Sequence, residues 1–235
     1  MTRHFDLPVG RNYVKATIES LPGGHGNVLW LLGRGAARLD SLDDRKRQAE
    51  LFKCNMLTFD YTGQGETTGD FGQTTINSHL AEARAAYRWF RDNRTEPMTI
   101  TGASYGGFIA ALLANEHVAD NLILRAPALF PFEMLNTKWT NLEPEIDNLT
   151  KGYRRDIEAM VRNPLFLQLS KFTGRILLIE HGDDEVIPLE VLKAYRRALP
   201  QADYWVAPGI QHSVTASGRK AQDRYESYIA NWLEG

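Results

Sequence analysis

One serine, one aspartate and one histidine form the combination of residues in this sequence that could carry out chemistry. Residues 102–106 read GASYG and fit the pattern GxSxG, with Ser104 at its centre. A serine hydroxyl is a weak nucleophile at neutral pH, so it needs a base to accept its proton and a carboxylate to orient that base. Asp184 and His212 follow in the chain order expected of a nucleophile elbow. The pattern predicts covalent acyl transfer through Ser104.

A glycine-rich turn can also bind a phosphate on its backbone N–H groups, but phosphate-binding loops have characteristic glycine spacings. GASYGG lacks the Lys-Ser/Thr ending of a P-loop. LLGRGAAR has Arg38 where GxGxxG needs its third glycine, and GQGETTG is one residue too long. None of the three stretches fits a nucleotide-binding loop.

The elements that must position these residues are indicated by short runs of aliphatic and β-branched residues. Six such runs are typical of strands buried on both faces: NVLWLL (27–32), CNMLTFD (54–60), MTITGA (98–103), NLILRA (121–126), RILLIEH (175–181) and DYWVA (203–207). Helical patterns alternate with them at 42–53, 76–93, 106–116, 189–198 and 217–233. Two earlier runs, HFDL and YVKATIES, flank a turn and predict an antiparallel hairpin. We expect an α/β fold with a mostly parallel sheet and helices on both faces.

The three candidate residues all follow predicted strands. Ser104 lies between a strand and a helix, where the helix N-terminus favours developing negative charge. RILLIEH leads into Asp183 and Asp184, and DYWVA leads into the loop that contains His212. Ligand chemistry in such sheets lies at the carboxyl ends of the strands, so we expect these side chains to meet there.

Residues 128–170 interrupt the alternation and are too long for a plain connection. The segment contains amphipathic helical pieces, so we expect a small, mainly helical cap over the carboxyl edge of the sheet. Its aromatic residues either line a substrate pocket or anchor the cap to the core. They are Phe130, Phe132, Trp139, Tyr153 and Phe166.

Taken together, these features resemble the α/β-hydrolase superfamily, in particular its serine esterases and lysophospholipase-like members with a small cap. The stretch FDYTGQGETTG also matches the superfamily's turn after the fourth strand, with Asp60, Gly63 and Gly65 in a DxxGxG pattern. The resemblance covers nearly the whole chain apart from the cap. It implies an eight-stranded sheet whose second strand is antiparallel, and a single α/β-hydrolase domain over residues 1–235 with the cap inserted at 128–170.

The resemblance also implies an oxyanion hole made of two backbone N–H groups. One belongs to Tyr105, the residue after the nucleophile. LLGRGA places Arg34 in the loop that supplies the other, although many relatives have His-Gly where this chain has Leu32-Gly33.

Two adjacent aspartates are candidates for the acid, because relatives often show GxxDxxVP where this chain reads HGDDEVIP. Asp184 keeps the usual distance to Pro188 and is preferred, while Asp183 stays open as the alternative. The histidines His4, His25, His79 and His117 are expected to be structural or solvent-facing. His181 is expected to shape the acid loop.

The charge balance and the single cysteine exclude several other classes of protein. The 235 residues include 27 Lys and Arg against 29 Asp and Glu, a formal net charge of −2, which offers no attraction for nucleic acid or anionic lipid. Cys54 is the only cysteine, so no intrachain disulfide is possible. No run approaches the roughly 20 apolar residues that span a bilayer, and the N-terminal stretch lacks a signal-peptide core. We expect a cytoplasmic protein with no nucleic-acid partner.

The expected function is that of a serine hydrolase that cleaves a small or medium carboxylic ester through an acyl-enzyme on Ser104, with no cofactor and no metal. Two alternatives use the same residues: a peptidase of the prolyl-oligopeptidase or aminopeptidase type, which the SYGG stretch resembles, and a thioesterase. The non-enzymatic alternative is a protein with the hydrolase fold that binds a ligand without turnover. The oligomeric state and the physiological substrate stay open.

Overall fold

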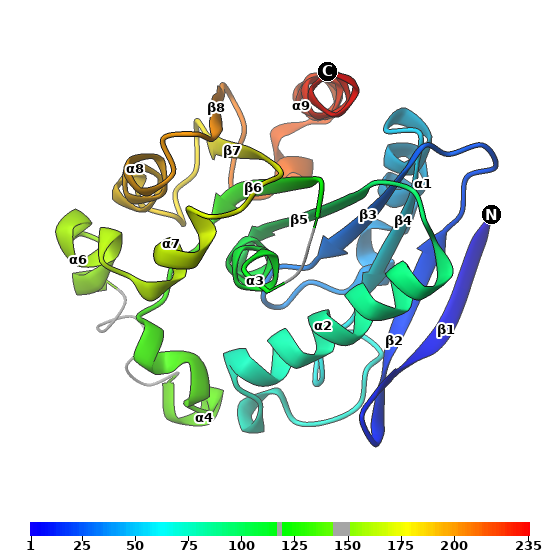
Figure 1. Cartoon of the computed structure of the whole chain (residues 1–235), viewed down its shortest axis with the longest axis horizontal. Coiled ribbons are helices and arrows are strands. Elements are labelled where there is room, and N and C mark those ends of the chain that lie inside the picture. Colours follow the sequence, from blue (N-terminus) through cyan, green and yellow to red (C-terminus); the bar gives the residue numbers. More distant parts are fainter. Residues whose placement is uncertain (117–118, 143–150) are drawn as a thin grey trace.

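The computed structural model describes residues 1–116, 119–142 and 151–235, and a sheet of eight strands forms its centre (Figure 1). The strand order is β1-β2-β4-β3-β5-β6-β7-β8. Within this sheet β2 runs antiparallel to β1 and β4, and the other neighbouring strands are parallel. The strands are β1 Thr2–Val9, β2 Asn12–Glu19, β3 Gly26–Leu31, β4 Cys54–Phe59, β5 Met98–Ser104, β6 Asn121–Pro127, β7 Arg175–His181 and β8 Asp203–Ala207. The predicted sheet and its antiparallel second strand are confirmed.

Helices cover both faces of the sheet, as the alternation of patterns predicts. In Figure 1, α1 and α9 lie on one face and α2, α3 and α8 lie on the other. The bounds are α1 Leu42–Leu51, α2 Ile76–Asn93, α3 Tyr105–Ala114, α8 Leu189–Ala198 and α9 Arg219–Glu234. Each helix lies within two residues of its predicted range. The central strands are apolar along their length because both faces are covered: all six residues of β4 are buried.

The insertion at 128–170 contributes short helical elements that pack beside α2, α3 and α8 (Figure 1). They are η3 Phe132–Asn136, α4 Trp139–Leu142, α6 Ile157–Val161 and α7 Pro164–Leu169. Part of the predicted amphipathic segment falls at 143–150, outside the described residues, as does His117. Phe130, Trp139 and Phe166 are at most 5% exposed and belong to the main core. These three aromatic residues therefore anchor this segment to the core, whereas Phe132 is exposed.

The DxxGxG turn after β4 has the structural role that its residues predict. Asp60 is fully buried, and its carboxylate accepts hydrogen bonds from the backbone N–H groups of Arg38, at 2.6 Å, and Glu66, at 3.0 Å. Gly65 has a φ of +53°, and a Cβ there would lie 2.4 Å from the Asp60 carboxylate. The adjacent Gln64 accepts a hydrogen bond from the N–H of Gly35, at 2.8 Å. This turn therefore holds the loop that follows β3.

The structure also shows the surroundings of Cys54 and the character of the helices. Cys54 is buried, and burial raises the pKa of its thiol to about 12, which makes it an unreactive core residue. None of the helices in the described ranges is both long and apolar enough to cross a membrane.

Candidate active site

Ser104 lies at a sharp turn between β5 and α3. Its backbone has φ +54° and ψ −122°, a conformation that L residues rarely adopt. The flanking glycines are required sterically: a Cβ on Gly102 would lie 2.3 Å from the backbone of Gly106, and a Cβ on Gly106 would lie 2.3 Å from the carbonyl oxygen of Leu31. The GxSxG pattern thus has a direct physical cause, because side chains at either glycine would prevent the turn that presents Ser104.

Asp184 and His212 are hydrogen-bonded to each other, with 2.8 Å between Asp184 Oδ2 and His212 Nδ1. The other carboxylate oxygen accepts the N–H groups of Val186 and Ile187, at 2.7 and 2.9 Å. Burial opposes ionisation of Asp184, but the hydrogen bonds from His212 and from the two amides outweigh it and lower the pKa of this carboxyl. Asp183 is exposed, and its carboxylate makes no such contact. The geometry favours Asp184 over its neighbour as the partner of His212.

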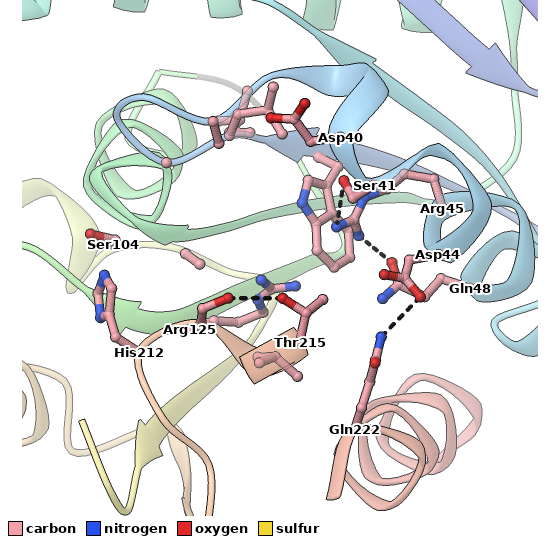
Figure 2. A pocket seen from close by; sticks show the side chains of 18 of the residues that line it. Asp40, Ser41, Asp44, Arg45, Gln48, Ser104, Arg125, His212, Thr215 and Gln222 are labelled. Atoms are coloured by element: carbon pink, nitrogen blue, oxygen red, sulfur yellow. Dashed lines mark hydrogen bonds between the residues drawn. The ribbon is translucent and has the colours of Figure 1, made fainter. Parts of the chain in front are cut away.

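Ser104 and His212 line one cavity of about 450 Å³. Figure 2 shows the His212 ring beside Ser104 at one end of this cavity. The two side chains, both within the described part of the chain, are not hydrogen-bonded to each other. Contacts of this kind are often long without substrate and tighten in the complex. The structure thus brings together all three residues that the sequence singles out.

The two predicted oxyanion donors are free backbone amides. Tyr105 is the first residue of α3, so its N–H has no acceptor within the helix. Arg34 belongs to the loop after β3 and lines the same cavity as Ser104. Over the described ranges neither N–H has a hydrogen-bond acceptor. The Arg34 side chain is exposed, and its guanidinium carbon lies 5.5 Å from the ring centre of Trp139.

The side chain of Tyr105 points away from this cavity into a group of buried rings under the cap. Its hydroxyl is hydrogen-bonded to Nδ1 of His79, at 2.7 Å, and burial raises its pKa well above the usual value. The centre of its ring lies 6.0 Å from that of Phe130 and 5.6 Å from that of Trp139. We call Tyr61, His79, Tyr105, Phe130 and Trp139 the cap-side cluster. These rings fill the space between α2, α3 and the cap.

The cavity itself opens on the other side of Ser104. It lies between the loop after β3, helix α1, helix α9 and the short helix η4 (Val214–Ser217). Not one of the described cap residues lines it. The described part of the cap packs against α2, α3 and α8 instead. We call this space the arginine cavity, after Arg45 and Arg125 in its lining.

Comparison with known proteins places the chain in a family. A family model described as Serine aminopeptidase, S33, matches residues 49–169, which include β4 to β6, the GxSxG turn and most of the cap. The chain belongs to this family. The match confirms the resemblance to the α/β-hydrolase superfamily.

Relatives of this S33 family member are distant in sequence. Alpha/beta hydrolase domain-containing protein 17B of Xenopus laevis is 24% identical over 184 residues, which cover 77% of this chain and 58% of that protein. The chain thus matches little more than half the length of this relative.

Among solved structures, several hydrolases share the fold of the chain over nearly its whole length. The predicted CIB-like hydrolase of Thermoplasma acidophilum matches with a TM-score of 0.70 and 17% identity, over 99% of this chain and 98% of that one. The esterase Pf2001 of Pyrococcus furiosus matches with a TM-score of 0.73 and 17% identity, over 100% and 90%. Est1E of Butyrivibrio proteoclasticus, solved with ferulic acid bound, matches with a TM-score of 0.68 and 16% identity, over 97% and 96%. These likenesses establish the fold.

Sequence reasoning missed the residues that line the far part of the cavity in this S33 family member. Trp30, Arg45, Gln48, Arg125 and Gln222 are all at most 9% exposed and all line it. One signal was present: Arg125 is the only charged residue in the apolar run NLILRA. An arginine in a strand that is buried on both faces needs a reason.

Proposed function

We propose that this protein is a serine hydrolase that cleaves a small or medium carboxylic ester through an acyl-enzyme on Ser104. The observation that carries the proposal is the 2.8 Å hydrogen bond between Asp184 and His212 beside a serine on a strained strand-to-helix turn. Base, orienting carboxylate and nucleophile come from different strand ends, which is the arrangement that activates a serine.

In the proposed reaction Ser104 Oγ attacks the ester carbonyl carbon while His212 Nε2 accepts the hydroxyl proton. Asp184 orients the imidazole and stabilises its charged form. The carbonyl oxygen becomes an oxyanion that accepts the N–H groups of Tyr105 and Arg34, each worth about 3–4 kcal/mol in comparable sites. The intermediate collapses, the ester C–O bond breaks, and His212 returns the proton to the departing alcohol. Water, activated by His212, then hydrolyses the acyl-enzyme.

The choice of an ester is supported by the nature of the relatives. The Pyrococcus furiosus protein is described as an esterase, and Est1E was solved with ferulic acid bound. The description of the matched family, serine aminopeptidase, favours a second candidate, the cleavage of an aminoacyl amide by the same residues. A thioester would use the same steps.

The first test is labelling with a fluorophosphonate, which reacts with an activated serine. We expect one adduct, at Ser104, and no adduct in the Ser104→Ala variant. Ser170→Ala is the matched control, because this serine lies at the end of α7 and its hydroxyl only contacts a backbone carbonyl. Folded protein that gives no adduct at Ser104 would refute the enzyme hypothesis.

The second test compares rates on matched ester, thioester and aminoacyl-amide substrates. We expect a higher kcat/KM on the ester than on the amide because an alcohol leaves more readily than an amine. Faster turnover of the amide would favour the aminopeptidase candidate. Rates above background that survive both Ser104→Ala and His212→Ala would contradict the assigned chemistry.

A further inference from the structure

We propose that the arginine cavity binds an anionic group of the substrate, a carboxylate or phosphate, through Arg125 with the help of Arg45. This inference rests on the proposed function, since it assigns a substrate class to the same site. The two arginines reach the cavity from different elements, Arg125 from β6 and Arg45 from α1 (Figure 2).

The position of Arg125 follows from the register of the sheet. Side chains alternate along a strand, so Arg125 shares a face with Ile123, which packs in the small core beneath α9. Its partner on the adjacent strand is Ala103, the residue before Ser104. Ala103 also lines the cavity, and its small side chain leaves space beside the guanidinium. The cation therefore emerges on the strand next to the nucleophile, at the same level of the sheet.

Arg125 is buried without a partner for its charge. It is 7% exposed, its Nε is fully enclosed without a hydrogen bond, and no ion pair or hydrogen bond to its terminal nitrogens occurs among the described residues. Arg45 is 9% exposed, and its hydrogen bonds within the described ranges go only to the neutral side chains of Gln48 and Ser41. Arginine does not give up its proton at neutral pH. Within the described residues, neither guanidinium group is thus hydrogen-bonded to a carboxylate.

Three carboxylates also line the cavity, those of Asp40, Asp44 and Glu226, and the Asp40 carboxylate accepts the N–H of Ala37. Arg47 forms ion pairs with both Asp44 and Glu226, and Gln222 donates to both carboxylates as well. Arg47 lies at the outer side of α1 and does not line the cavity. Glu226 is close enough to influence Arg125 electrostatically but accepts its hydrogen bonds from Arg47, Gln48 and Gln222. The hydrogen bonds of Asp44 and Glu226 are therefore directed to Arg47, Gln48 and Gln222, and not to Arg45 or Arg125.

Burial disfavours the charged form of both guanidinium groups. Burial lowers the pKa of both guanidinium groups, and burial together with the charge of Arg125 lowers that of Arg45 to about 9 although Asp44 and Glu226 act in the opposite direction. Tyr225 and His181 also face Arg125, and both are neutral at pH 7. A bound anion would reverse this penalty, and the gain would appear as affinity for an acidic substrate.

The ring of Trp30 holds both arginine side chains in position. Their guanidinium carbons lie over its ring, 3.6 Å from the ring centre for Arg45 and 4.0 Å for Arg125. Stacking of this kind holds the plane of a guanidinium and leaves its N–H edge free, which suits the bidentate recognition of a carboxylate or phosphate. The volume of about 450 Å³ accommodates a small acyl or alcohol group with such an anion at its end.

The test compares a charged ester with a neutral ester of similar shape. One substrate is the mono-p-nitrophenyl ester of glutaric acid, which carries a free carboxylate on the acyl side, and the other is its methyl ester. Butyryloxyacetate and butyryloxyacetamide make the same comparison on the alcohol side. We expect wild-type kcat/KM to favour the anionic member of at least one pair by 10-fold or more, because charge-assisted hydrogen bonds in a buried site are strong.

Arg125→Met keeps an unbranched side chain over Trp30 but removes the charge, so we expect it to lower this preference by about 10- to 100-fold. Arg175→Met is the matched control. Arg175 is stacked on Trp232 with 4.1 Å between guanidinium carbon and ring centre, far from the cavity, and its removal should leave the preference unchanged. An unchanged preference in Arg125→Met would overturn the proposal.

A binding measurement separates this proposal from the proposed reaction. Calorimetry on the Ser104→Ala variant, which needs no turnover, should detect binding of glutarate, of inorganic phosphate or of both, and none of neutral glutaramide. The two anions show which chemistry the cavity prefers. If the wild type cleaves both members of each ester pair equally and neither anion binds, the inference fails while the hydrolase function stands. If no ester is cleaved but an anion binds, the proposed function fails instead. Should Arg125→Met not fold, the wild-type preference and the calorimetry decide.

Discussion

The two regions on either side of Ser104 differ in how completely they are filled. On one side, the rings of the cap-side cluster lie against one another, with ring centres 4.8 to 6.1 Å apart. On the other side, the arginine cavity leaves about 450 Å³ open. Both regions contain aromatic residues, so aromatic content does not distinguish a core from a binding site.

The difference lies in charge. Buried polar atoms without partners occur in both regions, among them Nε1 of Trp139 in the cap-side cluster and Nε of Arg125 in the cavity. The first belongs to a neutral group and the second to a cation. An unpaired neutral N–H is a modest cost, whereas a buried, unpaired cation calls for a counter-ion. The comparison therefore assigns the structural role to the cap side and the recognition of a ligand to the cavity side.

The largest effect is expected at the two adjacent aspartates of the proposed catalytic site. We expect Asp184→Asn to lower kcat by about 10³- to 10⁴-fold, because the amide no longer stabilises the charged imidazole of His212. Asp183→Asn should lower it less than about threefold, since this carboxylate is exposed and does not contact His212. Steady-state kinetics of both variants provide the measurement. A larger loss in Asp183→Asn would show that the acid is the neighbouring residue.

The next variant tests whether the cap-side cluster has a purely structural role. Phe130 is 5% exposed and packs against Tyr105, Phe108 and Trp139. We expect Phe130→Ala to lower the free energy of unfolding by about 3–5 kcal/mol, as is usual for a large core residue. Urea denaturation measures this loss.

Phe132→Ala is the matched control, two residues away and 42% exposed, and its effect should stay within about 0.5 kcal/mol. In both variants the preference between charged and neutral esters should match that of the wild type. A changed preference in Phe130→Ala would mean that the substrate contacts the cap-side cluster. The role of this cluster would then not be purely structural.

Patterns that depend on near neighbours in the sequence were predicted well. The strands and helices follow from periodicity, and the glycines around Ser104 follow from a turn that excludes side chains. The positions of Asp184 and His212 follow from the strands that precede them. All of these are local constraints, so they are visible in a single sequence.

The role of the cap's aromatic residues and that of Arg125 were not predicted, and both depend on contacts between distant parts of the chain. Whether an aromatic residue of the cap faces a ligand or the core depends on where the segment packs, which its own sequence does not determine. Arg125 in NLILRA would be satisfied if a carboxylate of α9 paired with it. That Glu226 pairs instead with Arg47 becomes apparent only in three dimensions, because these residues lie far apart in the chain.

The smallest effect compares one buried histidine from each region. His79 lies in the cap-side cluster and His181 lies near Arg125, and burial lowers the pKa of each to about 4 from the usual 6.5. The folded protein thus keeps both neutral, while the unfolded chain binds protons below pH 6.5. Their contribution to stability is fully present above pH 6.5 and is lost as the pH falls towards 4. At pH 5 each histidine should account for a loss of about 2 kcal/mol.

Urea denaturation at pH 7.5 and pH 5 measures this loss, and His79→Gln should reduce it by about 2 kcal/mol relative to the wild type. The control variant is His4→Gln, which replaces an exposed histidine on β1. A pH dependence of His79→Gln equal to that of the wild type would mean that His79 is not held neutral in the cluster. The same measurement on the wild type and on His181→Gln, with and without added phosphate, tests whether an anion in the cavity affects His181. Because Arg125 contributes to the low pKa of His181, an anion bound in the cavity should weaken the pH dependence due to His181 and leave that due to His79 unchanged.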